Sequence, residues 1–454
     1  MAPKRLFHAR RPAADLLIRG AHVLDPRSTL DESRDVLIRD GRIVEIALPE
    51  TMTRDDGVEV LDAAGTHLLP GFVDPHVHLR TPGQEYKESI DTGTAAAAAG
   101  GYCAVVAMPN TEPTIDNAAV LGAVIERAER EARIPVGFLA AVTRELEGRE
   151  LTEMAELREV GAIGFTDDGR PVVSAGILRK ALQYQRLCGG IVALHEEDPA
   201  LSQDGVMHEG AVSTRLGLAG IPSLSESTMI ARDAALARYE GARLHFQHLS
   251  AVASVEALQA AKEMDHPAAR VSGEVSPHHL TLTDDAVRSL DSRFKMNPPL
   301  RGDRDRRALV DGLRSGVIDC VATDHAPHAL HEKEVPFEQA PMGTTGLETA
   351  FAVLYTDLVL PGELTLATLV ERMSAGAGLY ELPVPRIAVG RRADVCLVDL
   401  EACQTVGETD YASRSSNSAF HGRRLQGRVL LTIAAGAVAY RRAAAVRGGE
   451  RVAR

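Results

Sequence analysis

The central part of the chain alternates short apolar runs with longer amphipathic segments. Between the runs, segments such as AAVLGAVIERAEREA and SVEALQAAKEM have the apolar spacing of helices that bury one face. Eight strands alternating with helices over about 250 residues predict an α/β fold, a (β/α)8 TIM barrel. The eight apolar runs cover residues 72–79, 102–110, 135–143, 162–168, 191–198, 244–250, 269–280 and 318–328.

Both ends of the chain show a different pattern, in which short alternating runs are separated by turn residues. Near the N-terminus, Asp40-Gly41 stands between two alternating runs, which is a hairpin signal. The segments RRADVCLVDL and GRVLLTIAAGAVAYR repeat this pattern near the C-terminus. We therefore predict a small β-sandwich formed by residues 1–69 and 379–454, and a barrel formed by residues 70–378.

The composition of the chain argues against two classes of binding partner, nucleic acids and anionic membranes. The chain has 50 Lys and Arg against 63 Asp and Glu, a net charge of −13, and it contains no tryptophan. This balance argues against a nucleic acid or an anionic membrane as partner, and no apolar stretch has the length of a membrane span. The five cysteines show no CxxC spacing, which argues against a disulfide framework and favours a cytoplasmic location.

Metal-binding side chains follow several of the predicted strands. The first strand ends in His76-Val77-His78, and both imidazoles point the same way because side chains alternate along a strand. The active site of a TIM barrel forms at the carboxyl ends of its strands, and paired histidines there suit a divalent metal. Imidazole and carboxylate ligands together favour zinc, with manganese or cobalt as lesser options. Similar residues follow four other predicted strands: Asp167, Asp168, His195, His248 and Asp324.

Longer motifs surround these strand ends. They are GFVDPHVHLRTPG, AAAAAGGYCAVVAMPNTEPT, GFTDDGRPV, ALHEED, FKMNPPLR, VATDHAPH and PMGTTGLETAF. Two more, RIAVGRRADVCLVDL and SSNSAFHGRRLQGRVLLTIAAG, follow near the C-terminus. Together they resemble the dihydroorotase family of cyclic amidohydrolases, and the resemblance covers nearly the whole chain.

The resemblance implies a metal centre with one or two Zn²⁺ ions. Hydantoinases, allantoinases and some dihydroorotases use a carboxylated lysine after the fourth strand, but GFTDDG offers no lysine and resembles the subgroup that uses aspartate. Asp168 is expected to bridge the ions, because the spacing from Asn110 to His195 resembles that subgroup's pattern at the second aspartate. Asp167 is the alternative, since only one of two adjacent residues faces the barrel axis. The implied ligands are His76, His78, Asp168, His195, His248 and Asp324.

The resemblance also implies a substrate pocket. Arg80 suits the carboxylate of dihydroorotate, because a planar guanidinium binds a carboxylate through two parallel hydrogen bonds. His278 and His279 are expected to support the structure around the site. His245 is expected to pack against helices, and Glu88 to be solvated. The implied pocket residues are His78, Arg80, Asn110, Asn297, His328, Met342 and Gly343.

The implied reaction is the reversible cyclisation of N-carbamoyl-L-aspartate to L-dihydroorotate in pyrimidine biosynthesis. A metal would polarise the carbonyl and lower the pKa of the attacking water. Asp324 would be the catalytic residue that takes a proton from that water and returns it to the leaving ring nitrogen. The connection 328–343 is long for its place in a barrel and is expected to close over the substrate.

Two other functions stay open at this point. One is another cyclic amidase, such as a hydantoinase or allantoinase, against which the missing lysine, Arg80 and Asn110 argue. The other is a silent homologue that serves as a scaffold for aspartate transcarbamoylase, against which the complete ligand set argues. The expected partner is a small-molecule substrate, and a homodimer or an association of the active enzyme with aspartate transcarbamoylase is compatible with the resemblance.

Overall fold

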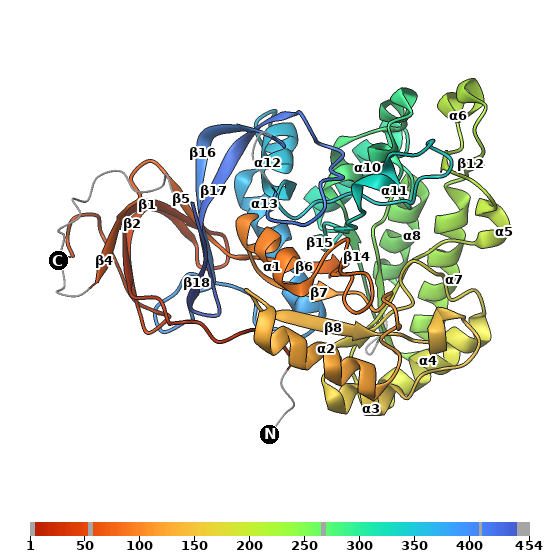
Figure 1. The fold of residues 1–454 in the computed structure, drawn as a ribbon, viewed down its shortest axis with the longest axis horizontal. Coiled ribbons are helices and arrows are strands. Elements are labelled where there is room, and N and C mark those ends of the chain that lie inside the picture. Colours follow the sequence, from red (N-terminus) through yellow and green to blue (C-terminus); the bar gives the residue numbers. More distant parts are fainter. Residues whose placement is uncertain (1–4, 53–57, 265–268, 408–410, 443–454) are drawn as a thin grey trace.

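The computed structural model describes residues 5–52, 58–264, 269–407 and 411–442. These residues form a barrel and a smaller sheet beside it (Figure 1). None of the helices within the described ranges combines the length and the apolar character needed to cross a membrane.

The barrel consists of eight parallel strands in sequential order. Each strand lies within one of the eight predicted apolar runs or overlaps it, so the prediction of a (β/α)8 barrel is confirmed. The ring closes where Val77 pairs in parallel with His325, and the His78 N–H donates to the His325 carbonyl at 2.9 Å. The strands are β6 (Phe72–Val77), β7 (Tyr102–Ala107), β8 (Val136–Ala140), β9 (Gly164–Phe165), β10 (Val192–Leu194), β13 (Arg243–Phe246), β14 (Arg270–Val275) and β15 (Cys320–Val321).

Helices surround the barrel, and local sequence signals set their starts. Ser89, Asn117 and Ser174 each stand directly before a helix and accept a hydrogen bond from a backbone N–H of its first turn. The longer helices are α1 (Ile90–Ala99), α2 (Ala118–Glu131), α3 (Met154–Val160), α4 (Ala175–Cys188), α7 (Leu224–Glu240), α8 (Val252–Glu263), α10 (Asp303–Ser315) and α13 (Leu366–Ser374). The shorter elements are α5 (Pro199–Ser202), α6 (Ala211–Leu216), α9 (Pro277–Thr281), α11 (Leu330–Lys333), α12 (Ala350–Leu354), α14 (Gly376–Leu379), β11 (Met207–His208) and β12 (Gly220–Ile221).

The two ends of the chain build one sheet, as predicted. The sheet has the order β18-β17-β16-β5-β1-β2-β3, with β4 beside β1, and the Asp40-Gly41 turn joins β2 to β3 as expected. The two ends meet where β5 pairs antiparallel with β16. The strands are β1 (Leu16–Asp25), β2 (Leu30–Arg39), β3 (Arg42–Ala47), β4 (Glu59–Asp62), β5 (His67–Pro70), β16 (Val395–Thr405), β17 (Arg424–Ala434) and β18 (Ala437–Arg441).

Alternation along β16 divides this sheet between two cores. Val395 and Leu397 pack with residues of β1 and β2 in a core that belongs to the small sheet. Cys396 and Val398 point to the other face and join the large core of the barrel. Thr432 on β17 donates to a backbone carbonyl of α1 at 2.7 Å. One sheet therefore encloses its own core and also covers one side of the barrel.

The joining of the two ends can be tested at Gly436, in the turn between β17 and β18. A Cβ at Gly436 would lie 2.6 Å from the carbonyl oxygen of Gly41, and its φ is +77°. We expect Gly436→Ala to lower the free energy of unfolding by about 3 kcal/mol, from backbone strain and steric overlap together. Chemical denaturation measures this change.

Gly65→Ala is the matched control. Gly65 has a φ of +79°, but no atom lies within 4 Å of its added Cβ, so only the backbone cost of about 1–2 kcal/mol remains. Equal losses in the two variants would contradict the close contact between the ends of the chain.

Candidate metal centre

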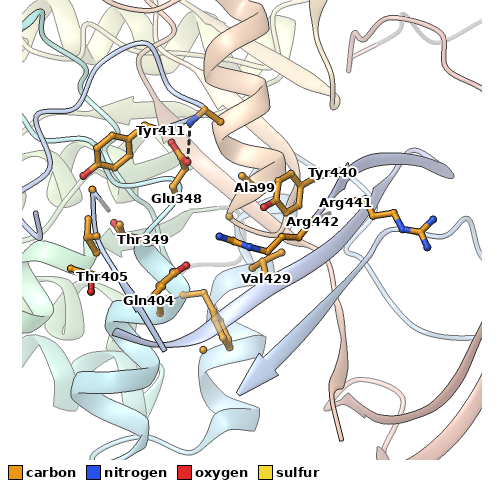
Figure 2. A pocket seen from close by; sticks show the side chains of 17 residues that line it. Ala99, Glu348, Thr349, Gln404, Thr405, Tyr411, Val429, Tyr440, Arg441 and Arg442 are labelled. Carbon is orange, nitrogen blue, oxygen red and sulfur yellow. Dashed lines mark hydrogen bonds between the residues drawn. The ribbon is translucent and has the colours of Figure 1, made fainter. Parts of the chain in front are cut away.

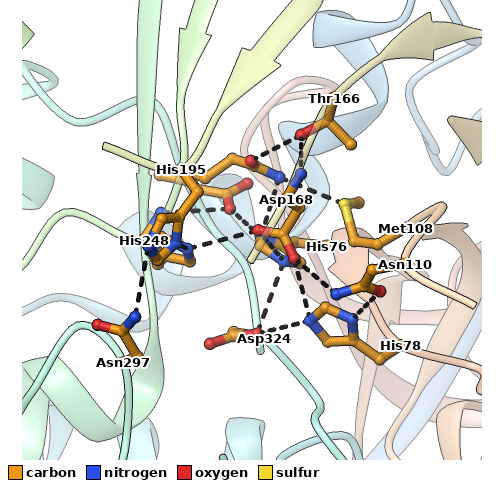
Figure 3. A network of polar contacts seen from close by, with 12 residues as sticks. His76, His78, Met108, Asn110, Thr166, Asp168, His195, His248, Asn297 and Asp324 are labelled. Carbon is orange, nitrogen blue, oxygen red and sulfur yellow. Dashed lines mark hydrogen bonds and ion pairs between the residues drawn. The ribbon is translucent and has the colours of Figure 1, made fainter. Parts of the chain in front are cut away.

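The residues predicted to bind metal lie together at the carboxyl end of the barrel (Figure 3). They follow five different strands, and all of them are buried. The barrel therefore brings together side chains from distant parts of the sequence. They are His76 and His78 at the end of β6, Asp168 after β9, His195 after β10, His248 after β13 and Asp324 after β15.

Asp168 lies in the middle of this cluster. Its Oδ1 is 3.4 Å from His76 Nε2 and 3.6 Å from His248 Nε2. Its Oδ2 is 3.5 Å from His78 Nε2. Two groups of three residues share Asp168, and within each group the ligand atoms lie within 4.8 Å of one another: His76, His78 and Asp168 in one, and Asp168, His195 and His248 in the other. This arrangement suits a carboxylate that serves two adjacent cation positions.

The neighbouring Asp167 turns away from the cluster. Its Oδ1 accepts the backbone N–H groups of Val142 and Thr143 at 2.8 and 2.9 Å, and its Oδ2 accepts the Thr143 hydroxyl. Its carboxylate is therefore used to fix the end of β8. Of the two aspartates that the sequence left open, the structure brings Asp168 to the histidines.

The charges of the cluster fit a cation. Burial raises the pKa of Asp168, but the surrounding histidines, His76 foremost, lower it by more than burial raises it. The pKa therefore lies well below its usual range. Burial lowers the pKa of His76, but Asp168 and Glu274 more than offset this and raise it well above normal. His76 Nε2 and Asp168 Oδ1 are buried and have no hydrogen-bond partner within the described residues. Buried carboxylates facing open imidazole nitrogens call for positive charge, and this donor set suits a divalent metal.

A second carboxylate, Glu274 on β14, binds the ring nitrogen of His76 that faces away from the cluster. Glu274 Oε1 lies 2.7 Å from His76 Nδ1, so the opposite nitrogen, Nε2, faces the cluster. Glu274 Oε2 lies 3.0 Å from His245 Nε2, and His245 Nδ1 is 2.8 Å from the Ser272 hydroxyl. The expectation that His245 packs against helices is therefore wrong, because it belongs to this interior network. Sequence analysis missed Glu274, which stands in the middle of the predicted run 269–280 but near the end of the observed strand β14.

His278 and His279 lie outside the ligand cluster, as the sequence led us to expect. His279 Nδ1 is 2.7 Å from the Ser276 hydroxyl, and its Nε2 donates to the Pro298 carbonyl at 2.9 Å. Both rings are buried, and burial is the main cause that lowers the pKa of each. Both side chains are therefore neutral, and His279 is bonded to the loop that carries Asn297.

A cavity of about 240 Å³ opens onto the cluster. Its lining includes every residue predicted to bind substrate: His78, Arg80, Asn110, Asn297, His328, Met342 and Gly343. Arg80 is buried, with its Nε donating to the Pro327 carbonyl at 3.2 Å. Asn110 accepts from His78 Nδ1 at 2.9 Å and lies 3.4 Å from Asp168 Oδ2. The lining of the cavity thus combines residues predicted to bind metal with the buried cation of Arg80.

Glu197 adds a carboxylate that sequence analysis did not assign. Its Oε2 lies 3.0 Å from His195 Nε2 and accepts from Asn297 Nδ2 at 2.7 Å. Burial raises the pKa of Glu197, but His195 and other hydrogen-bond donors lower it to about 2. This anion fixes the orientation of His195 and Asn297 together.

The connection 328–343 is hydrogen-bonded to the segment before Asn297. Lys333 donates to the carbonyls of Ser292 and Pro341 at 2.9 and 2.7 Å. Lys295 donates to the Glu338 carbonyl at 2.8 Å and accepts the Gly343 N–H at 2.8 Å. The connection therefore covers one side of the cavity in this structure.

Comparisons with known proteins agree with this geometry. Residues 65–254 match the family model described as Dihydro-orotase-like. A dihydroorotase of Anaeromyxobacter dehalogenans (strain 2CP-C) is 47% identical over 428 residues, which are 94% of this chain and 98% of that protein. A dihydroorotase of Pelotomaculum thermopropionicum is 44% identical over 424 residues, 93% of this chain and 98% of its own.

The fold has a clear counterpart among solved structures. The L-hydantoinase (dihydropyrimidinase) of Arthrobacter aurescens superimposes with a TM-score of 0.82 at 25% identity, over 94% of this chain and 96% of that one. A D-hydantoinase from a Thermus species gives a TM-score of 0.79 at 26% identity, over 96% and 97%. With sequence relatives that match over nearly their whole length, the chain belongs to the dihydroorotase family of cyclic amide hydrolases.

Proposed function

We propose that this chain is a dihydroorotase that interconverts N-carbamoyl-L-aspartate and L-dihydroorotate in de novo pyrimidine biosynthesis. The observation that carries the proposal is the 240 Å³ cavity, whose lining combines a buried arginine and two asparagines with a cluster of histidines and aspartates. A small cyclic amide with a carboxylate substituent needs these two features together. The metal centre acts on the amide, and the arginine binds the carboxylate.

The resident metal in this proposal is Zn²⁺, with one or two ions in each subunit. The four histidines and two aspartates of the cluster would hold it, and such nitrogen and oxygen donors suit zinc. When bound, the metal polarises the ring carbonyl and lowers the pKa of the attacking water.

Asp324 is proposed to carry the proton. It lines the cavity, and its Oδ1 lies 3.1 Å from His78 Nε2. Burial raises its pKa, but the surrounding histidines lower the pKa by more than burial raises it. The group is therefore an ionised carboxylate, the form that accepts a proton. In ring opening it takes a proton from the attacking water and gives it to the leaving ring nitrogen. In cyclisation the proton moves in the reverse direction.

His328 is proposed to be a neutral acceptor for the substrate. Burial, and then the nearby charge of Arg80, lower the pKa of His328 to about 2. Its Nε2 lies 2.8 Å from the Met342 carbonyl and must carry the hydrogen, which leaves Nδ1 as an acceptor. Nδ1 is buried and has no hydrogen-bond partner among the described residues, so it suits a ring N–H of the substrate.

A hydantoinase-like activity is the alternative that the fold comparison favours. The solved neighbours are named hydantoinases, but the chain has Asp168 where a carboxylated lysine would otherwise follow the fourth strand. Metal analysis of the purified protein, with turnover measured on dihydroorotate, hydantoin and allantoin, separates the two. We expect zinc and a clear preference for dihydroorotate. Preference for hydantoin, or metal-loaded protein without turnover, would overturn the proposal.

Three further features belong to the proposal. The domain boundaries are 1–69, 70–378 and 379–454, supported by the ends of β5 and α14. A cytoplasmic location is supported by the cysteines, which are all free thiols. A homodimer, or an association with aspartate transcarbamoylase, stays a prediction.

Asp324→Asn tests the proton transfer. Asparagine keeps a ligand oxygen but cannot accept the proton, so we expect much of the metal to be retained while kcat falls by about 10²–10⁴-fold. Metal content and steady-state turnover are measured on the same preparation. Near-normal turnover with metal verified would exclude Asp324 as the proton carrier.

Arg80→Ala tests substrate binding. Removing a charged hydrogen-bond donor from a buried site is expected to raise KM for dihydroorotate about 10–100-fold, with metal content unchanged. Arg80→Lys is the matched variant, because it keeps the charge but loses the planar pair of donors, and should give an intermediate KM. An unchanged KM in Arg80→Ala counts against carboxylate recognition by this residue.

Glu274→Gln tests the support of His76. Glutamine has nearly the same shape but lacks the charge that fixes the imidazole, so we expect metal affinity to fall about 10–100-fold. Competition with a chelator measures that affinity without any assay of turnover. Asp25→Asn serves as control, since Asp25 is a buried carboxylate of the small sheet and should leave metal affinity unchanged. Equal metal affinity in Glu274→Gln and the wild type would refute the role.

A further inference from the structure

The segment 411–421, which we call the strap, belongs in sequence to the small sheet but lies against the barrel. It connects β16 to β17 and reaches towards the carboxyl end of the barrel strands (Figure 1). At its start, Glu348 accepts the backbone N–H groups of Ala412 and Ser413 at 3.1 and 3.0 Å, beside a hollow of about 370 Å³ (Figure 2). The strap is therefore fixed to the barrel at the point where it arrives there.

Glu88 anchors the next part of the strap. Its carboxylate accepts from the Ser413 hydroxyl and from the Arg414 N–H, and it lies 3.2 Å from His325 Nε2. Glu88 has no exposed surface, so the expectation that it is solvated is wrong. Ser415 then donates to the Lys87 carbonyl at 2.7 Å. These bonds hold the strap along the barrel without reaching the cavity.

Asn417 is the strap residue that contacts the cavity wall. Its Oδ1 accepts the His328 N–H at 3.0 Å. Its Nδ2 donates to the carbonyls of Ala326 and Gly343 at 3.1 and 3.2 Å. Asn417 is 5% exposed, so these backbone partners, rather than water, satisfy its side chain. All three of them line the 240 Å³ cavity.

The two wall segments that Asn417 joins approach each other closely. One is Ala326–His328 after β15, and the other is the end of the 328–343 connection. A Cβ at Gly343 would lie 2.7 Å from the Ala326 Cβ, which shows how little space separates them. The Ala326 N–H also donates to the Thr344 carbonyl at 2.9 Å. The Asn417 side chain bonds to both segments, because its amide offers one acceptor for the His328 N–H and two donors for the Ala326 and Gly343 carbonyls.

We infer that Asn417 is a positioning residue for the substrate pocket, because its amide fixes the backbone of His328 and Gly343 at the spacing that dihydroorotate requires. The inference rests on the proposed function of the cavity. Asn417 contacts none of the six ligand residues through a hydrogen bond recorded in the described structure. Its loss should therefore alter substrate binding and leave the metal centre intact.

Steady-state kinetics of the full-length, zinc-loaded protein test this inference. For Asn417→Ala we expect KM for dihydroorotate to rise about tenfold or more, kcat to change less than about threefold, and metal content to stay at the wild-type level. Asn417→Asp keeps the acceptor for the His328 N–H but places a carboxylate against two carbonyls, and it should raise KM in the same way. This second variant decides the question if the alanine variant folds poorly.

Ser415→Ala is the matched control. It removes one buried hydrogen bond from the same strap but none from the cavity wall, so its KM should equal that of the wild type. An unchanged KM in folded Asn417 variants, or an equal rise in Ser415→Ala, overturns the inference. A fall in kcat and metal content at constant KM overturns it as well, because the effect would then lie at the metal cluster.

Hydrogen exchange separates failure of this inference from failure of the proposed function. The His328 amide should exchange faster in Asn417→Ala than in the wild type and in Ser415→Ala, whatever the substrate is. Unchanged exchange would show that Asn417 does not fix this backbone. A wild-type protein without dihydroorotate turnover would overturn the proposed function, and with it dihydroorotate as the substrate. The exchange rate of the His328 amide would still show whether Asn417 fixes this backbone.

Discussion

Closure of the barrel between β6 and the chain after β15 is the constraint on which the site depends. Val77 pairs with His325, and Asp74 on β6 accepts from the Thr323 N–H at 3.1 Å and from its hydroxyl at 2.5 Å. These bonds join the first and the last strand. The seam lies directly beside the paired histidines on one side and Asp324 on the other. A barrel that failed to close here would keep its other strands in order but would separate the ligands into two groups.

Charges of both signs line the cavity beside this seam. Two buried carboxylates, Asp168 and Asp324, line the cavity, and neighbouring histidines keep the pKa of each low although burial raises it. Arg80 lines the same cavity, and although burial lowers its pKa, a guanidinium remains a cation. A protein with a net negative charge can therefore accommodate an anionic substrate. The electrostatic potential that the substrate meets is set by the charges lining the cavity and not by the net charge of the chain.

The barrel and most of the cluster could be predicted from the sequence because both follow from local patterns. Each residue predicted to bind metal stands in or near the end of an apolar run, and the barrel brings such ends together. The choice between Asp167 and Asp168 required the structure, because it depends on Thr143, a partner from the segment that follows β8. His245 was placed wrongly for a similar reason. Alternation tells which residues share a face, but not that Glu274 from the neighbouring strand faces the same interior.

Glu88 and Asn417 were missed because their partners are distant in sequence and their own surroundings look like ordinary loops. What brings the strap to the cavity is the pairing of β5 with β16. β5 ends at Pro70 and β6 begins at Phe72, so β16 is fixed next to the strand that carries the paired histidines. Gly71 permits this approach, since a Cβ there would lie 3.2 Å from the carbonyl carbon of Asp394, directly before β16, and the Gly71 N–H donates to the Asp394 carbonyl at 2.9 Å. The strap therefore reaches the cavity from the end of the chain that builds the small sheet, and its Asn417 bonds to the backbone of three lining residues although none of the six predicted metal ligands belongs to that sheet.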